Sequence, residues 1–349
     1  MSDLDALSAW AGQFLPVPLP RAGLQLVAVT GDAGFRRYFR SNTEPSFIVA
    51  LAPPEHEDNC AFVNIAIAMT QGGVDVPKIY AVDYERGFLL QEDLGDRLYL
   101  DVLNDETQSQ LYDRAEAALL QIQRLPADSA LFPAYDASLL QRELELFPEW
   151  FAAGLLGVEL DKSARLLLND LFTTLMSSAA EQPQVVVHRD FHSRNLLALE
   201  EGGVGVIDFQ DAVLGPLSYD LVSLLRDCYI RWPRALVETR VEGFRRKLLA
   251  QAGEGAAPGL SDAATFLRWF DLMGLQRHLK VLGIFARLSL RDGKARYLDD
   301  LPLVLRYVLE VAQKYPETED FYRWFITCLE PTLDRHSWYL PWQAAGEAS

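Results

Sequence analysis

The sequence predicts an α+β protein with two lobes, and two observations support this fold class. Up to Leu94, most apolar residues fall in short runs that end at Gly, Pro or Asp, as strands and turns do. Beyond that point apolar residues recur mainly at helical spacing, apart from one short β segment at 185–209. We therefore expect a small β-rich lobe over 1–94 and a larger helical lobe over 95–349.

The small lobe is expected to open with a short amphipathic helix, which three closely spaced prolines end. Gly31-Asp32-Ala33-Gly34 predicts a turn between the first two strands, and apolar residues from Asn59 to Gly72 recur at helical spacing. The expected elements are helices over 1–15 and 59–72 and strands over 24–29, 35–40, 47–51, 79–82 and 87–91.

The larger lobe is expected to be helical on both sides of its β segment. Within that segment, Glu200-Glu201-Gly202-Gly203 predicts a hairpin turn between two apolar runs, 196–199 and 204–207. The expected helices cover 105–125, 138–153 and 161–181, and a further helical part extends from Tyr219 to about Cys328 with a loop at 252–259.

Composition excludes several classes of protein. A net charge of -17 argues against general nucleic-acid binding, which needs clustered Lys and Arg. Cys60, Cys228 and Cys328 are far apart and form no CxxC pair, so a disulfide framework or structural zinc site is not expected. No apolar run approaches the roughly 20 residues that span a bilayer, and the acidic N-terminus does not resemble a signal peptide. We expect a cytoplasmic monomer that binds neither nucleic acid nor membrane.

The stretch VHRDFHSRNL, residues 187–196, concentrates polar chemistry between two apolar runs. Asp190 and Asn195 are five residues apart on this loop, and Asp208 follows the apolar run 204–207. If 196–199 and 204–207 pair as a hairpin, Asp208 lies beside Asn195. One carboxylate and one carboxamide suit a hard cation such as Mg²⁺, and Asp190 would then be available to accept a proton.

Other interpretations of the loop are weaker. Asp and Asn in a loop often only bond their own backbone. Here, however, they occur together with His188, the five-residue spacing, the hairpin and Asp208-Phe209, a combination that favours catalysis. His188 and Arg189 are expected to brace the loop. A zinc site at His192 is disfavoured because no Cys or second His lies at ligand spacing.

These residues form the pattern H-R-D-x-x-x-x-N followed by D-F-x, which resembles the catalytic signature of kinases. The variant with Ile207-Asp208-Phe209 resembles the aminoglycoside phosphotransferase-type small-molecule kinases. This resemblance implies a two-lobed protein-kinase-like fold, ATP as the phosphoryl donor, Mg²⁺ held by Asn195 and Asp208, and Asp190 as the catalytic base. It also implies that Asp220 caps a helix and buttresses the catalytic loop.

Longer strings resemble a narrower group, the bacterial anomeric sugar kinases of peptidoglycan recycling. They are GDAGFRRYFR, GFLLQEDLGDRLYL, HRDFHSRNLL, VIDFQDAVLGPLSYDLVSLLRDCYIRW and MGLQRHLKVLGIFARLSLRDGKARYLDDLP, and they run over nearly the whole chain. The resemblance implies phosphorylation of N-acetylmuramate or N-acetylglucosamine at C1, to the α-1-phosphate.

The nucleotide side departs from the usual kinase pattern. The loop with Gly31 and Gly34 lies where a kinase covers the phosphates, and backbone amides and the Arg36 or Arg37 guanidinium are candidates to bind them. The third strand, at 47–51, has no Lys. An Arg of the glycine loop substitutes for it, a more distant Lys such as Lys78 reaches in, or the protein is a pseudokinase. Glu55 and Glu57 are the candidates for the acidic partner of that cation.

The connector between the lobes contains Gln91-Glu92-Asp93-Leu94. In this fold adenine bonds connector backbone, so the Glu92 carbonyl and the Leu94 amide are candidate contacts; the alternative for the acidic side chains is a solvated turn.

On the acceptor side, Arg277 and Lys280 share a helix face and are candidates to bind the lactyl carboxylate of N-acetylmuramate. The alternative is a solvated helix face. Arg194 and Gln210, close to the catalytic residues in the sequence, are further candidate sugar contacts.

We therefore predict a kinase that uses ATP and Mg²⁺ to phosphorylate an amino sugar. Two rivals stay open. One is a kinase of this family with another acceptor, such as an aminoglycoside, choline or homoserine. The other is a nucleotide-binding pseudokinase, because the strand Lys is missing.

Overall fold

The computed structural model describes residues 3–29, 35–253 and 257–346. Contacts divide the chain into two compact units, residues 1–131 with 194–212, and 132–193 with 213–349. The predicted lobe boundary at 94–95 lies inside the first unit, because the hairpin at 196–206 packs with the segment that follows the connector.

The first unit is built on a five-stranded antiparallel sheet with the strand order β1-β2-β3-β5-β4. All five strands were predicted, within about two residues at their ends. Their bounds are β1 Leu26–Val29, β2 Arg37–Ser41, β3 Phe47–Leu51, β4 Ile79–Asp83 and β5 Phe88–Glu92.

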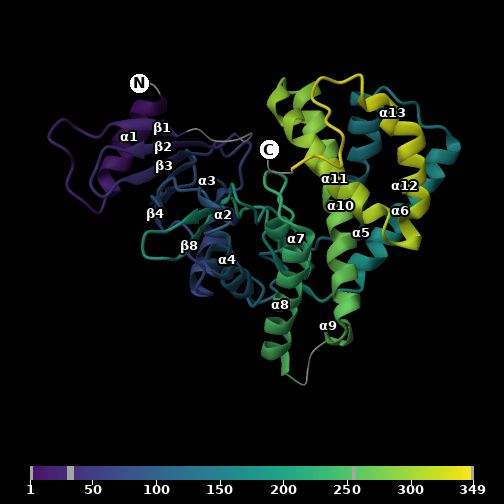
Figure 1. Cartoon of the computed structure of the whole chain (residues 1–349). Coiled ribbons are helices and arrows are strands. Elements are labelled where there is room, and N and C mark those ends of the chain that lie inside the picture. The colour runs from purple at the N-terminus through teal and green to yellow at the C-terminus, as the bar shows by residue number, and fades with distance from the viewer. Residues whose placement is uncertain (1–2, 30–34, 254–256, 347–349) are drawn as a thin grey trace. The chain divides into compact units, whose positions relative to one another are not determined.

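The two faces of this sheet have different roles. Helix α1 (Asp3–Phe14) covers one face, where Trp10 and Leu7 pack on Phe39 and Val49 (Figure 1). Because side chains alternate along a strand, Tyr38 and its cross-strand neighbour Ala50 belong to the opposite face. By the same alternation, the two arginines of Arg36-Arg37-Tyr38 (the RRY run) point to opposite faces of the sheet.

Three helices and a hairpin complete the first unit. They are α2 Asn59–Gln71, α3 Tyr99–Val102, α4 Gln108–Ile122, and strands β7 Leu196–Ala198 and β8 Val204–Val206. The predicted hairpin is confirmed, with Leu196 opposite Val206. Gly205 is required there, because a Cβ on it would lie 2.9 Å from the Leu94 side chain and 3.2 Å from that of Leu197.

The second unit is mainly helical, with one two-stranded ladder, β6 paired with β9. Its long helix α10 is buried along most of its length and packs with α11, as Figure 1 shows. The bounds are α5 Ala137–Leu144, η1 Phe147–Leu155, α6 Lys162–Ala180, β6 Gln184–Val187, β9 Val213–Pro216, α7 Tyr219–Leu225, α8 Arg234–Ala252, α9 Pro258–Ser261, α10 Ala263–Leu290, η3 Ala295–Asp300, α11 Leu301–Ala312, η4 Pro316–Thr318, α12 Glu319–Trp324, η5 Phe325–Leu329 and α13 Glu330–Leu333.

One predicted helix differs in detail. The single helix expected over 138–153 is an α-helix that ends at Leu144, followed by a π-helical segment, η1. Pro148 has no amide hydrogen and cannot continue the α-helical bonding pattern into the next turn. Helix α10 also approaches closely there, since a Cβ on Gly283 would lie 2.4 Å from the backbone of Leu146.

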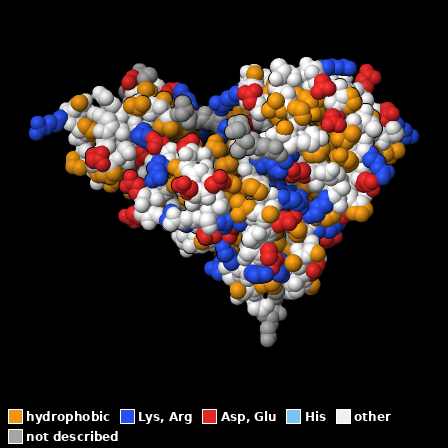
Figure 2. Space-filling model, in the orientation of Figure 1, with side chains coloured by type: hydrophobic (Ala, Val, Ile, Leu, Met, Phe, Trp, Pro, Cys, Tyr) orange, Lys and Arg blue, Asp and Glu red, His pale blue; other side chains and the backbone are white. Residues whose placement is uncertain are grey.

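The surface in view carries charged side chains of both signs and hydrophobic side chains (Figure 2). Figure 2 shows acidic side chains scattered over this face, not gathered in one patch. Within the described ranges, no helix is both long and apolar enough to cross a bilayer.

Candidate active site

The catalytic loop starts where strand β6 ends, and its backbone is held by Asp220. The Asp220 carboxylate accepts hydrogen bonds from the amides of His188, at 2.6 Å, and Arg189, at 3.0 Å. Asp220 lies inside the first turn of α7 and is fully buried. The expected buttress is confirmed. The helix cap is wrong, because the cap position belongs to Ser218 and the carboxylate is used by the loop.

His188 and Arg189 brace the loop, as expected. His188 is buried and its Nδ1 accepts from the amide of Asp190 at 3.3 Å. The Arg189 guanidinium pairs with Glu143 at 2.5 Å. Both side chains are therefore directed into the protein. Asp190 is the one carboxylate of the loop 187–196 and is the candidate for the reaction.

Backbone strain is concentrated on the predicted motif. In the described part of the chain, the non-glycine residues with positive φ are Arg189, at 76°, and Asp208, at 64°. Such conformations cost roughly 1–3 kcal/mol each and persist where surrounding contacts fix them. One precedes the predicted base and the other is a predicted metal ligand.

Asp190 is held in its ionised form. Burial acts to raise its pKa, but the positive charges of Lys280, His192 and Arg277 outweigh burial, and the pKa falls to about 2. A carboxylate in this environment is ready to accept a hydrogen bond from an acceptor hydroxyl over the whole neutral range.

Glu143 connects this charge to the loop. Its carboxylate pairs with Arg189 and also with Lys280, at 2.9 Å, and accepts a hydrogen bond from Tyr135. Lys280 Nζ donates in addition to the Tyr219 hydroxyl at 3.2 Å. Sequence reasoning missed Glu143. Its signal was an acidic residue on the otherwise apolar face of α5.

Arg277 and Lys280 lie on a buried stretch of α10, so the solvated helix face is wrong. They differ in their partners. Lys280 is committed to Glu143 and Tyr219, whereas the described contacts give Arg277 only the thiol of Cys228, at 3.5 Å, and leave its Nε without a partner. A buried guanidinium without a carboxylate at ion-pair distance is suited to an anionic ligand.

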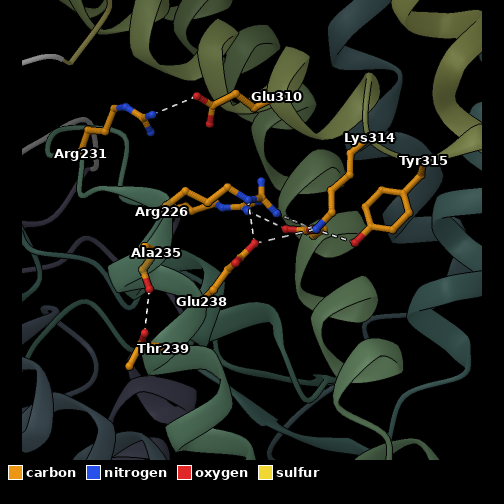
Figure 3. A network of polar contacts seen from close by, with 10 residues as sticks. Arg226, Arg231, Ala235, Glu238, Thr239, Glu310, Lys314 and Tyr315 are labelled. Atoms are coloured by element: carbon orange, nitrogen blue, oxygen red, sulfur yellow. Dashed lines mark hydrogen bonds and ion pairs between the residues drawn. The ribbon is translucent and has the colours of Figure 1, made fainter.

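The segment after α7 is fixed to α10 by a second charge network, drawn in Figure 3. The fully buried Asp271 carboxylate pairs with Arg226 at 2.5 Å, Lys314 at 2.8 Å and Arg234 at 3.3 Å, and accepts from Tyr315 at 2.7 Å. Figure 3 shows Arg226, which follows α7, and Lys314 and Tyr315, which follow α11, converging on one point.

This network supports the end of the catalytic loop. Asp227, the residue after Arg226, accepts from the amide of Ser193 at 2.8 Å. The ring of Tyr229 meets that of His192 edge-on at 5.6 Å. The charge network therefore anchors the segment that contacts His192 and Ser193.

In the first unit, the hairpin brings the predicted metal ligands together. Asn195 Nδ2 lies 3.4 Å from Asp208 Oδ2, and Gln210 Nε2 donates to Asp208 Oδ1 at 2.7 Å. Asp208 is exposed, and within the described residues no group of three His, Cys, Asp or Glu forms a denser metal site. One carboxylate and neighbouring amides fit Mg²⁺, which usually takes only one or two protein carboxylates and completes its shell with water and phosphate oxygens.

Arg194 and Gln210, the other predicted sugar contacts, both flank this pair. Arg194 is half-buried and directly precedes Asn195. Gln210 is tied to the Asp208 carboxylate, and its buried Oε1 has no hydrogen-bond partner among the described atoms.

The two arginines of the RRY run are separated by strand alternation. Arg36 pairs with Glu57 at 3.1 Å, its guanidinium lies 4.2 Å from the centre of the Phe62 ring, and its side chain is only 6% exposed. Arg37 points to the opposite face, where its side chain is 59% exposed and 3.9 Å from Asp3 of α1. Arg37 therefore lies on the α1 face of the sheet, away from the face of Arg36. Gly31 and Gly34 lie outside the described residues.

Lys78 does not take the place of the missing strand lysine. It precedes edge strand β4, two strands away from β3, and its ammonium lies over the Tyr80 ring at 5.3 Å. Two strand spacings are roughly 10 Å. Of the two candidate acidic partners, Glu57 is paired with Arg36 and Glu55 is exposed.

The predicted adenine contacts lie on a braced connector. Asp93 is not a solvated turn residue, because its buried carboxylate pairs with Arg40 at 2.6 Å. The Glu92 amide donates to Lys78 at 2.8 Å, and no hydrogen bond joins the Leu94 amide to another described residue. The Leu94 side chain lies against Gly205 of the hairpin.

Comparisons with known proteins agree with this geometry. The sequence matches the model of the phosphotransferase enzyme family over residues 25–258. It is 45% identical to N-acetylmuramate/N-acetylglucosamine kinase of Pseudomonas putida over 84% of this chain and 85% of that protein. The kinase of the same name from Pseudomonas aeruginosa is 43% identical over 89% of this chain and 92% of its own length.

Among solved structures, ADP-bound aminoglycoside phosphotransferase APH(2'')-Ib has a TM-score of 0.57 at 13% identity, with 88% of this chain and 98% of that one covered. This similarity shows the fold and confirms the prediction of a two-lobed, protein-kinase-like architecture. The chain therefore belongs to the phosphotransferase enzyme family.

Proposed function

We propose that this protein is an ATP-dependent kinase that phosphorylates the anomeric hydroxyl of N-acetylmuramate, N-acetylglucosamine or both, to give the α-1-phosphate in cell-wall recycling. The substrate is inferred from the 45% and 43% identity, over most of the chain, to enzymes named N-acetylmuramate/N-acetylglucosamine kinase. The braced loop with an ionised Asp190 supports the chemistry.

In this proposal Asp190 orients the acceptor hydroxyl and takes its proton. The acceptor oxygen then bonds to the γ-phosphorus, the bond from that phosphorus to the β–γ bridging oxygen breaks, and ADP leaves. An anomeric hydroxyl is more acidic than other sugar hydroxyls, so one carboxylate suffices. Asn195 and Asp208 would hold Mg²⁺, which neutralises charge on the phosphate oxygens.

Arg277 is the proposed partner of an anionic sugar substituent such as the lactyl carboxylate. It is buried, near enough to Asp190 to lower the pKa of that carboxylate, and without a carboxylate partner among the described residues. Lys280 holds Glu143 and acts on the acceptor only through its charge. Arg194 and Gln210 are proposed as neutral-sugar contacts beside the metal ligands.

On the nucleotide side, the proposal assigns the phosphates to the Gly31–Gly34 loop and Arg36. The adenine edge is assigned to the backbone of Glu92 and Leu94, on the connector that the Asp93–Arg40 pair braces. A cytoplasmic monomer without nucleic-acid or membrane partners stays a prediction.

The experiment is an acceptor panel with the purified full chain, ATP and Mg²⁺, followed by ADP release and by phosphorus NMR of the product. We expect turnover with N-acetylmuramate or N-acetylglucosamine and a C1 phosphate. Asp190→Asn should abolish turnover and leave ATP binding within error of the unsubstituted chain.

Turnover with choline, homoserine or an aminoglycoside but not with amino sugars would reject the substrate. ATP binding without turnover on any acceptor would instead favour a pseudokinase, the interpretation that the missing strand lysine motivates. An active Asp190→Asn variant would reject the role of Asp190.

A further inference from the structure

The first unit contains a buried cation, Arg36, close to a strand that has no positive charge. Within β3, the residue opposite Tyr38 is Ala50, and no residue of the strand from Phe47 to Leu51 has a positive charge. In kinases a lysine of β3 supplies the cation that meets the nucleotide phosphates. Arg36, just before β2, faces the same side as Tyr38.

Arg36 is fixed from two directions. Glu57, the residue before the Asp58 cap of α2, pairs with it at 3.1 Å. The Phe62 ring of α2 lies below the guanidinium at 4.2 Å, and Phe62 in turn stacks on Phe209, with ring centres 4.9 Å apart. Phe209 follows the predicted metal ligand Asp208 directly, so Arg36 is joined through two rings to the metal position.

The surrounding charges identify the class of ligand. Tyr38 interacts electrostatically with both Glu57 and Asp208 and accepts a hydrogen bond from Arg36. The buried Nε of Arg36 has no hydrogen-bond partner among the described atoms, although its side chain is 94% removed from solvent (6% exposed). A guanidinium with five N–H donors, one of them buried and unsatisfied, fits an oxygen-rich anion.

We propose that Arg36, clamped by Glu57 and seated on Phe62, is the cation that binds the α- and β-phosphates of the nucleotide in place of a lysine on β3. This inference rests on the proposed kinase function and deepens it. It also makes Glu57 a positioning residue, which orders the long Arg36 side chain before the nucleotide arrives. A guanidinium binds two oxygens side by side, which fits the oxygens of a phosphate group.

The test is equilibrium binding of ATP, ADP and adenosine to the full chain, measured by titration calorimetry without acceptor. In Arg36→Ala, ATP and ADP should bind roughly 10- to 100-fold more weakly, as expected for the loss of charge-assisted hydrogen bonds. Adenosine has no phosphates and should bind as before. Arg36→Lys should recover part of the loss, and Glu57→Gln should cost roughly 3- to 10-fold for ATP and ADP.

Arg37→Ala is the matched control, since the neighbouring arginine lies on the α1 face of the same strand and should leave all three affinities unchanged. Circular dichroism checks folding; if Arg36→Ala does not fold, Arg36→Gln and Arg36→Lys are compared instead. An unchanged ATP affinity in folded Arg36 variants, or an equal loss for adenosine, overturns this inference alone. If the unsubstituted chain does not bind ATP, the proposed function and this inference both fail.

Discussion

The carboxylate of Asp220 accepts a 2.6 Å hydrogen bond from the backbone amide of His188, so a residue of α7 determines the shape of the catalytic loop. The same carboxylate accepts from Arg189, whose backbone is in the left-handed region. Asp220→Asn replaces one acceptor with an amide donor and leaves one buried loop N–H unsatisfied, at a cost of about 1–3 kcal/mol.

We therefore expect Asp220→Asn to lower the melting temperature and to reduce kcat more than KM, because Asp190 is displaced while the nucleotide contacts are unchanged. Thermal denaturation and steady-state kinetics measure the two effects. Asp320→Asn, at an exposed position of α12, is the control. Wild-type kcat in Asp220→Asn would contradict the buttressing role.

A second prediction concerns pH. Asp190 has a folded pKa of about 2, below the ordinary value of 3.8, and Lys280 is the first cation that opposes the effect of burial. Asp190 therefore contributes stability above pH 3.8, which is lost as the pH falls toward 2. Lys280→Met should raise this pKa and shift the acid limb of the kcat/KM profile to higher pH.

The profile is measured from pH 4 to 9, a range in which the unsubstituted chain should show no acid limb from Asp190, whereas in Lys280→Met the limb should enter the range. It is compared with the profile of Lys162→Met, which removes an exposed lysine at the start of α6. Glu143→Gln should act less strongly on the acid limb, since it keeps the positive charge of Lys280. An acid limb that does not move in Lys280→Met would mean that Lys280 does not control Asp190.

A third prediction concerns stability. Asp271→Asn removes the carboxylate shared by Arg226, Arg234 and Lys314. Arg234 and Lys314 keep Glu238, but the buried Arg226 keeps no other carboxylate among the described ion pairs. Breaking a buried ion pair in this way costs about 3–5 kcal/mol in the free energy of unfolding, measured by urea denaturation. Asp292→Asn, which breaks the surface pair with Arg291, should leave the free energy of unfolding nearly unchanged. Equal losses in the free energy of unfolding for the two substitutions would show that the buried network stabilises the protein no more than a surface ion pair does.

A fourth prediction concerns the metal. Chelation by EDTA should abolish turnover, and added Mg²⁺ should restore it. Asp208→Asn should weaken Mn²⁺ binding, followed by electron paramagnetic resonance with ADP present, by roughly 100-fold or more, because even outer-shell substitutions cost 10- to 100-fold. Glu200→Gln, at the turn of the same hairpin, is the control. Unchanged Mn²⁺ affinity in Asp208→Asn would place the metal elsewhere.

Much of the fold was predictable because it is encoded locally. Alternation and turn residues located all five strands of the first sheet, and the Glu200–Gly203 turn located the hairpin that brings Asn195 to Asp208. Strand alternation also contained the information that Arg36 and Arg37 point to opposite faces, although the sequence alone did not show which face α1 would cover.

What could not be predicted depends on distant residues. The burial of Arg277 and Lys280 was not predicted, because two cations on a helix normally indicate a solvent-exposed face. Glu143, from a different helix, pairs with Lys280 and offsets the free-energy cost of burying its charge. Glu57 was indistinguishable from Glu55 in the sequence, since its pairing with Arg36 exists only in three dimensions.

The division of the chain into units has a practical consequence for dissection. The hairpin at 194–212 belongs to the first unit although 132–193 of the second unit precede it. Neither unit is thus one continuous stretch of polypeptide, and no single truncation or proteolytic cut releases either of them whole. A circularly permuted gene has the same difficulty, because the order first unit, second unit, first unit, second unit is kept from every starting point.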